Sequence, residues 1–270
     1  MSQKYDITIK DIFSNMADDI TAYFLGLTYT KTDELNIEFT KVEKRQSDIV
    51  LKCTTEKGDI AVHLEFQSDN DDKMPYRMLR YSLEIMEKYN LTSYQLVIYM
   101  GKNDLRMENK LDYNLGEENI LDYRYKIIDV GTIKFLDITK TDYYDLYALL
   151  PIMDRERRKT EGEKYLKECV EAIKNIPIDI NKKKDITFKA EILSGLVYSR
   201  EVIERVFTEV MEMLRIEESE AYKMILEKGA KEKSLRIAKE LLKEGMDINK
   251  IAKITELSIE EIKKLMNWKR

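Results

Sequence analysis

Residues 59–71, DIAVHLEFQSDND, alternate apolar and polar side chains. This two-residue period predicts a β-strand over 60–67 with two different faces. The apolar face carries Val62, Leu64 and Phe66. The polar face carries an imidazole, a carboxylate and a carboxamide, from His63, Glu65 and Gln67. A polar strand face in a compact protein looks either at water or at a functional site.

A second carboxylate is expected beside Glu65. Residues 47–53 (SDIVLKC) predict a preceding strand that begins next to Asp48, and residues 55–59 (TEKGD), with Gly58, predict a hairpin turn. Antiparallel neighbours would bring Asp48 and Glu65 to the same end of the sheet, away from that turn. Two carboxylates a few ångströms apart repel each other unless a cation lies between them. The alternative is that both acids simply face solvent at strand ends.

The donor types favour Mg²⁺ as that cation, because Mg²⁺ prefers oxygen ligands and needs only one or two carboxylates beside water and a phosphate. A bound Mg²⁺ lowers the pKa of a water molecule and neutralises charge that develops on a phosphoryl group. Gln67 is neutral, so it is suited to orienting a water or a phosphate oxygen rather than to acting as a strong base. The predicted chemistry is therefore hydrolysis of a phosphate ester.

The bulk composition limits the partners and the compartment. The chain has 270 residues, 43% apolar and 36% charged, with a net charge of −5. That charge excludes a uniformly basic nucleic-acid binder, so any DNA contact must be a local patch. Cys53 and Cys169 lie in no CxxC or Cys–His pattern, which disfavours a zinc site or a disulfide framework and fits a reducing compartment.

The first residues do not resemble a signal peptide, and no apolar run approaches 18 residues. We therefore expect a cytoplasmic, nucleoid-associated protein without a membrane partner. Nothing in the sequence indicates a small-molecule cofactor.

Periodicity predicts an α/β core followed by helices. The expected core elements are a helix at 8–26, strands at 34–44, 47–53 and 60–67, a helix at 74–89, and strands at 94–100 and 121–130. Helices are expected at 163–176, 189–198 and 201–214, then a long helix ending at Gly245, a short one at 248–254 and a last one capped by Ser258 with Glu261. The expected domains are 1–150, 151–225 and a helix-turn-helix-like tail at 226–270.

Residues 47–53 and 58–81 resemble the nuclease core of the Rpn family of recombination-promoting nucleases, transposase-like proteins of the PD-(D/E)XK superfamily. The matching residues are Asp48, Glu65, Gln67, Ser68, Met74, Pro75, Arg77 and Tyr81. The opening helix matches at Asp6, Lys10 and Phe13. Residues 241–265 resemble the C-terminal segment of the family.

The resemblance implies a restriction-endonuclease-like core in which Asp48 and Glu65 ligate Mg²⁺, or Mn²⁺ in its place, with the backbone carbonyl of Phe66. Gln67 stands where the superfamily more often has Lys, and Ser47 replaces its Pro. The implied function is a DNA endonuclease linked to recombination or transposition. The sequence has no evident base-reading element, so low sequence specificity is expected, and double-strand cleavage would favour a homodimer.

Other residues have open alternatives. His63 could polarise a carboxylate or touch DNA, or be a structural histidine. Arg77, with Arg80, could grip a phosphate or pair with Asp69–Asp72 or with Glu84. Lys10 could reach the site from the first helix. The tyrosines of 121–126 could stack bases or belong to the core.

The tail from residue 227 to 270 has a net charge of +4, so the rest of the chain carries −9. A basic helix-turn-helix tail on an acidic body suits a DNA anchor, while its Lys/Glu alternation equally suits packing or self-association. Two function classes stay open besides the DNA endonuclease: a nuclease for RNA or single strands, and a non-catalytic DNA-binding or interaction module.

Overall fold

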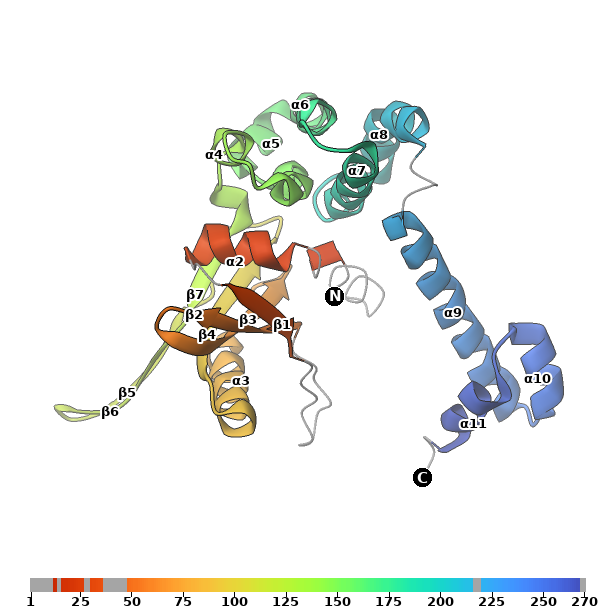
Figure 1. The fold of residues 1–270 in the computed structure, drawn as a ribbon, viewed down its shortest axis with the longest axis horizontal. Coiled ribbons are helices and arrows are strands. Elements are labelled where there is room, and N and C mark those ends of the chain that lie inside the picture. Colours follow the sequence, from red (N-terminus) through yellow and green to blue (C-terminus); the bar gives the residue numbers. More distant parts are fainter. Residues whose placement is uncertain (1–11, 14–15, 27–29, 36–47, 216–219, 268–270) are drawn as a thin grey trace. The chain divides into compact units, whose positions relative to one another are not determined.

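The fold is described from a computed structural model that covers residues 12–13, 16–26, 30–35, 48–215 and 220–267. The chain divides into two compact units, residues 1–214 and residues 215–270. Figure 1 follows the chain from red to blue through the elements of both units.

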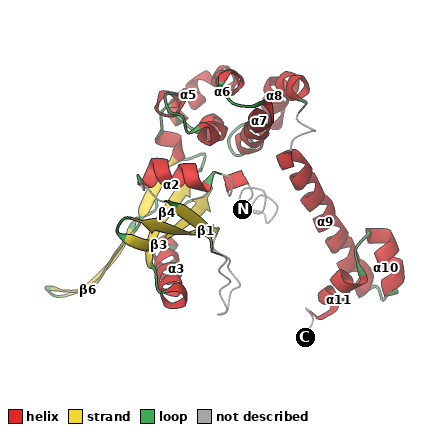
Figure 2. Cartoon of the chain, viewed as in Figure 1, coloured by secondary structure: helices red, strands yellow, loops and turns green. Residues whose placement is uncertain are grey.

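The first unit contains a mixed five-stranded sheet in the order β1-β2-β3-β4-β7. Its strands are β1 (Lys31–Glu34), β2 (Ile49–Thr55), β3 (Gly58–Gln67), β4 (Thr92–Tyr99) and β7 (Lys126–Asp129). The strands β1, β2 and β3 pair antiparallel, whereas β3, β4 and β7 pair parallel. The predicted α/β class is therefore confirmed, and Figure 2 shows the sheet in yellow among the red helices.

The hairpin between β2 and β3 is tighter than the sequence predicts. A turn at Glu56 and Lys57 joins the strands, and Gly58 already belongs to β3 with a φ of 110°, which a side chain would disfavour. The strand β2 consequently runs over 49–55 instead of 47–53. Its predicted antiparallel pairing with β3 is confirmed, with Ile49 opposite Leu64.

The helix α3 (Met74–Tyr89) has the predicted bounds and begins with Pro75 in its first turn. It ends at Asn90, which adopts the left-handed conformation of a helix C-cap. Its inner face packs on β2, β3 and β4 through buried side chains of one cluster: Val50, Ala61, Met74, Met78, Tyr81, Ile85, Val97 and Tyr99.

The opposite face of β3 packs toward the N-terminal helical segment. Phe66 stacks on Phe13, with ring centroids 4.1 Å apart. The helix α2 (Ala17–Leu25) buries Ile20 and Leu25 and ends at Gly26, the predicted stop, with a φ of 62°. Figures 1 and 2 show α2 and α3 on opposite sides of the sheet.

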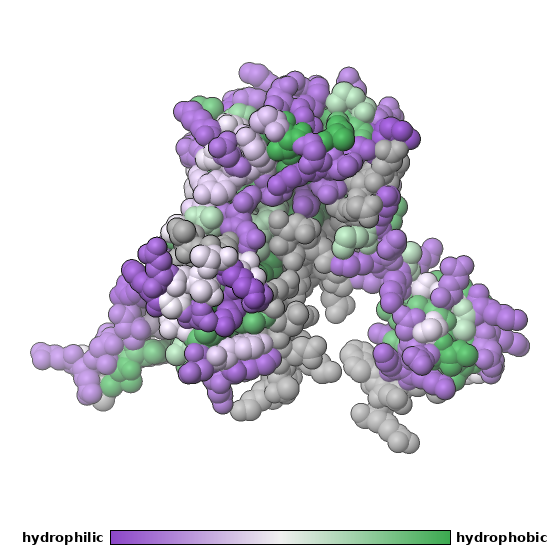
Figure 3. Space-filling view, viewed as in Figure 1, coloured by the Kyte–Doolittle hydropathy of each residue, from purple (hydrophilic) through white to green (hydrophobic). Residues whose placement is uncertain are grey.

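Two strands differ from the sequence-based expectation. The predicted strand at 121–130 is divided at Tyr125, whose side chain is buried and donates a hydrogen bond to the carbonyl of Glu108. Its first half belongs to a hairpin of β5 (Lys110–Leu115), which was not predicted, and β6 (Glu118–Arg124). This hairpin extends away from the main sheet (Figure 1), and apolar surface is visible along it in Figure 3. Its Ile120 is 59% exposed. Of the strand expected at 34–44, residues 36–44 lie outside the described part.

Helical elements complete the first unit. They are η1 (Val130–Thr132), α4 (Phe135–Thr139), η2 (Tyr144–Ile152), α5 (Arg155–Glu161), α6 (Glu163–Asn175), α7 (Ile180–Ser194) and α8 (Arg200–Leu214). The prediction of α7 at 189–198 is wrong in its bounds, because Asp179 caps the helix by accepting hydrogen bonds from the backbone of Asn181 and Lys182.

The second unit consists of α9 (Glu220–Lys243), α10 (Ile248–Thr255) and α11 (Ile259–Asn267). Its small core is formed by Ala238, Ile251, Leu257 and Ile262. The predicted capping box is present: Ser258 Oγ accepts from the Glu261 backbone, and the Glu261 carboxylate accepts from the Ser258 backbone. Among the helices that the structure describes, none is long and apolar enough to cross a membrane.

A buried ion pair should stabilise the first unit. Arg155 donates hydrogen bonds of 2.9 and 2.6 Å to Asp129, and both side chains are less than a tenth exposed. Arg155→Met should lower the free energy of unfolding by about 3–5 kcal/mol, because it leaves the Asp129 charge buried without its partner. Urea unfolding followed by circular dichroism measures this. Arg200→Met, which breaks an exposed pair with Glu204, should cost less than about 1 kcal/mol, and equal losses would contradict this account.

The stability of the second unit should depend on acid pH through Glu261. Its hydrogen bonds to Lys231 and to Ser258 lower the pKa of the Glu261 carboxyl from 4.5 to about 2. Because the folded-state pKa is the lower one, the stabilisation is full above pH 4.5 and is lost as the pH falls through about 2. Hydrogen exchange of α10 and α11, corrected for intrinsic rates, should show this loss in the wild type and not in Glu261→Gln. The neighbouring Glu260→Gln should behave as wild type.

Candidate active site

Asp48 and Glu65 both lie near the carboxyl end of β3. The register sets Ile49 opposite Leu64, and continuing it by one residue would set Asp48 opposite Glu65. Residues directly opposite in an antiparallel pair have side chains on the same face. Asp48 Oδ2 also accepts a hydrogen bond of 2.8 Å from the backbone N–H of Phe66. This bond fixes the Asp48 carboxylate at the carboxyl end of β3, away from the hairpin turn.

The Glu65 carboxylate is buried, with only 5% of the residue exposed. Its Oε1 lies 3.3 Å from Arg77 Nη2, and its Oε2 lies 3.3 Å from His63 Nε2. The contact with His63 lacks the alignment of a hydrogen bond, and Glu65 Oε2 has no other hydrogen-bond partner. Arg77 therefore provides the main charge compensation for Glu65.

The polar face of β3 does not look at water. The helix α3 covers it, and His63 is completely buried with its ring edge-on to Tyr81 at a centroid distance of 5.1 Å. The alternative of a solvent-exposed strand end is therefore wrong for Glu65. A carboxylate at such a position costs free energy unless it is paired, and Arg77 is its ion-pair partner.

Arg77 forms ion pairs inside the site. Its Nη1 lies 3.2 Å from Oδ2 of Asp71, which belongs to the acidic loop that the sequence suggested as a partner. Its Nη2 lies 3.3 Å from Glu65 Oε1. The side chain is 15% exposed, so it is not fully enclosed. Arg80 is exposed on the same helix, and Lys10 lies outside the described residues.

Gln67 ends β3, and a pocket begins directly after it. The Gln67 carbonyl accepts a hydrogen bond of 2.7 Å from the backbone of Met100, which ties the ends of β3 and β4 together. The pocket has a volume of about 360 Å³, and polar residues that line it include Ser68, Asn70 and Lys102. It lies at the carboxyl ends of two parallel strands, where α/β sheets commonly bind ligands.

Sequence reasoning missed Gln95 and the position of Tyr123. Gln95 Nε2 lies 2.9 Å from His63 Nδ1, and Gln95 Oε1 accepts a hydrogen bond from the Tyr123 hydroxyl. Burial raises the pKa of the Tyr123 phenol, so it stays protonated. The signal was present in the sequence, because Gln95 is the one amide side chain in β4 and directly precedes its apolar residues 96–98.

The oxygen donors fit a hard divalent cation. Asp48 and Glu65 supply carboxylate oxygens, and Glu65 Oε2 is a buried acceptor without an aligned hydrogen bond. Such a set matches Mg²⁺, which retains several water ligands. Within the described ranges, no group of three or more His, Cys, Asp and Glu side chains gathers to hold a metal. Both cysteines are buried and free, and burial raises the pKa of the Cys53 thiol to about 11, which makes it a poor ligand.

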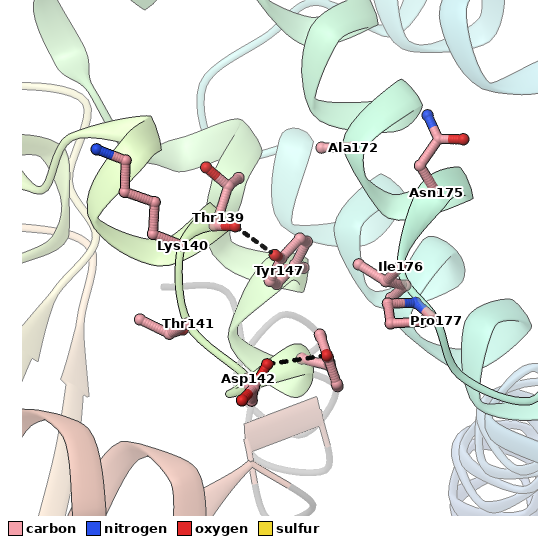
Figure 4. A pocket seen from close by; sticks show the side chains of 10 residues that line it. Thr139, Lys140, Thr141, Asp142, Tyr147, Ala172, Asn175, Ile176 and Pro177 are labelled. Carbon is pink, nitrogen blue, oxygen red and sulfur yellow. Dashed lines mark hydrogen bonds between the residues drawn. The ribbon is translucent and has the colours of Figure 1, made fainter.

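Another pocket, of about 390 Å³, lies between the end of α4, η2 and the end of α6 (Figure 4). The Tyr147 hydroxyl donates to the Thr139 carbonyl at its wall, and the Tyr144 hydroxyl donates to Asp142. None of the predicted site residues lines this pocket, and it offers no comparable pair of carboxylates.

The chain combines a mixed α/β core, with acids near the open end of its β2–β3 hairpin, and a separate helical unit. Residues 31–184, more than half of the chain, match the family described as "Putative transposase, YhgA-like". Residues 231–267 match the C-terminal helix-turn-helix domain of the Rpn/YhgA-like nuclease family. The chain belongs to this family, and the resemblance seen in the sequence is confirmed. No curated protein and no solved structure matches the chain.

The pairing of Glu65 predicts a large effect at Arg77. Arg77→Met should lower the free energy of unfolding by about 3 kcal/mol, because it leaves a buried carboxylate without its cation. Arg80→Met, on the exposed side of the same helix, should change it by less than about 0.5 kcal/mol. Denaturant unfolding of the two variants measures the difference. Similar values for both would mean that Arg77 does not compensate the Glu65 charge.

Proposed function

We propose that this protein is a Mg²⁺-dependent endonuclease that hydrolyses DNA phosphodiester bonds with low sequence specificity. The observation that carries the proposal is that Asp48 accepts a hydrogen bond from the Phe66 N–H, next to the buried Glu65, at the carboxyl end of β3. Membership of a nuclease family supports the same reaction class.

Asp48, Glu65 and the backbone carbonyl of Phe66 would hold the ion. When bound, Mg²⁺ would acidify a water molecule and stabilise charge on the phosphoryl group. The Phe66 N–H keeps the Asp48 carboxylate in position through the bond to Oδ2. Gln67 follows on the same strand face, where its amide would orient the attacking water or a phosphate oxygen. The cover provided by α3 keeps water away from Glu65 and so strengthens the electrostatic interactions of its carboxylate.

Arg77 is the residue proposed to bind the substrate. It remains partly exposed beside Glu65, and a guanidinium binds a phosphate group through two parallel hydrogen bonds. Its ion pairs with Glu65 and Asp71 hold it in place before any substrate arrives. A substrate-binding role for Lys10 is proposed from the family resemblance alone.

The second unit is proposed to anchor the nuclease on DNA. Its match to a helix-turn-helix domain and the net charge of +4 on its residues 227–270 support phosphate contacts. The first turn of α11, which in this motif faces the base edges, carries Glu260 and Glu261. The Glu261 carboxylate already forms an ion pair with Lys231 and accepts the capping hydrogen bond from the Ser258 backbone. An acidic first turn disfavours base readout near phosphates and supports low specificity. A homodimer and a role in recombination or transposition are part of the same proposal.

The second candidate is a non-catalytic DNA-binding module. It is favoured by one observation: Arg77 already neutralises Glu65 within the chain. In that case the acids would serve the structure, and neither DNA binding nor stability would depend on a divalent cation.

Cleavage of supercoiled plasmid separates the two. Wild-type protein with Mg²⁺ or Mn²⁺ should nick or linearise the plasmid, and EDTA should abolish this. Asp48→Ala and Glu65→Ala should each reduce the rate at least about 100-fold, since they remove groups that act at the reacting phosphate. Asp59→Ala, at the other end of β3, breaks only an exposed pair with Lys52 and should cleave like wild type.

Inactivity of the wild type across divalent metals, with metal-independent DNA binding, would favour the module. Equal cleavage by wild type, Asp48→Ala and Glu65→Ala would show that the proposed site does not catalyse the cleavage.

A further inference from the structure

A buried chain of polar groups leads from Tyr123 to Glu65. The Tyr123 hydroxyl donates to Gln95 Oε1, and Gln95 Nε2 lies 2.9 Å from His63 Nδ1. On the other side of the ring, His63 Nε2 lies 3.3 Å from Glu65 Oε2. Gln95, His63 and Glu65 are each at most 5% exposed, so these groups have no access to bulk water as alternative partners.

The backbone carbonyl of Met78 decides which way the Gln95 amide points. The two ends of a carboxamide have nearly the same size, so only their partners identify nitrogen and oxygen. One end of Gln95 lies 3.0 Å from the Met78 carbonyl oxygen. A carbonyl oxygen can only accept, so this end must be the NH₂ group. The remaining amide oxygen then faces Tyr123, whose hydroxyl can donate to it.

The amide direction in turn decides the tautomer of His63. The second N–H of Gln95 faces His63 Nδ1, so this ring nitrogen must be the acceptor. The ring proton of neutral His63 is therefore on Nε2, which faces Glu65 Oε2. The other tautomer would set two donors against each other at Gln95, in a buried environment where an unmade hydrogen bond is costly. It would also point a lone pair of Nε2 at the negatively charged Glu65 carboxylate.

We propose that Gln95 and His63 are positioning residues for Glu65: Gln95 fixes the Nε2–H tautomer of His63, and this N–H, 3.3 Å from Oε2, attracts that oxygen electrostatically and so favours one orientation of the carboxylate for a divalent cation. The second half of this inference rests on the proposed function. Metal-binding groups are commonly oriented by an outer layer of polar contacts, and its loss weakens metal affinity about 10- to 100-fold. Tyr81, edge-on to the imidazole, limits rotation of the ring.

The chain contains one histidine, so its tautomer can be read directly. In protein labelled with ¹⁵N-histidine, long-range ¹H–¹⁵N spectra at about pH 8 should show the Nε2–H pattern for the wild type. Tyr123→Phe should keep this pattern, because the Met78 carbonyl still directs the amide. Gln95→Leu should lose the pure Nε2–H pattern. Ser93→Ala, a neighbour on β4 outside the chain of contacts, should be unchanged. An Nδ1–H pattern in the wild type would overturn the inference without any variant.

Mn²⁺ affinity, measured by electron paramagnetic resonance of the full chain, tests the second half. Gln95→Leu should bind Mn²⁺ about 10- to 100-fold more weakly than the wild type, and Ser93→Ala should bind equally well. Unchanged affinity in a folded Gln95→Leu would overturn the positioning role. The absence of Mn²⁺ binding in the wild type would overturn that role together with the proposed function, while the Nε2–H pattern would still support the tautomer assignment.

Discussion

The burial of the Glu65 charge is the constraint on which the rest of the site depends. A carboxylate under α3 is tolerated only because Arg77 and His63 lie against it, each at 3.3 Å. These contacts link the central strand to α3, and Gln95 and Tyr123 extend the network to β4 and β6. The same burial that costs stability removes water from the carboxylate and strengthens its interaction with any cation. The contacts that allow the Glu65 charge to be buried under α3 are therefore the same contacts on which the proposed catalytic chemistry depends.

The acidic residues at the two ends of β3 differ in how firmly they are held. At the hairpin end, Asp59 forms an exposed pair with Lys52, of the kind that contributes little to stability. At the carboxyl end, Asp48 is fixed by a backbone N–H and Glu65 is enclosed. The acids beside the pocket are thus oriented before a ligand binds, which lowers the cost of assembling a cation site.

Local signals were enough to predict much of this fold. Period-two alternation identified β3, Pro75 and the apolar spacing gave the bounds of α3, and the Ser258–Glu261 pair predicted the last cap. The antiparallel pairing of β2 with β3 followed from one turn between two strands. Other features depend on tertiary contacts that a sequence pattern does not encode. The predicted strand at 121–130 is interrupted at Tyr125 because the ring of this residue is buried. The helix α3, which covers Glu65, is contacted by a residue as distant in sequence as Gln95, which donates to the Met78 carbonyl. The sequence favoured a structural role for His63 over a contact with a carboxylate or DNA, and the orientation of Gln95 shows which ring nitrogen faces Glu65.

Calorimetric titration of the full chain with Mg²⁺ or Mn²⁺ tests the central claim most directly, because it needs neither a substrate nor turnover. The account predicts a single saturable site in the wild type that is lost in Asp48→Asn and in Glu65→Gln, and retained in Asp59→Asn. A wild-type protein that binds no divalent cation, or a site that survives both substitutions, would contradict the assignment of Asp48 and Glu65 as the metal-binding pair.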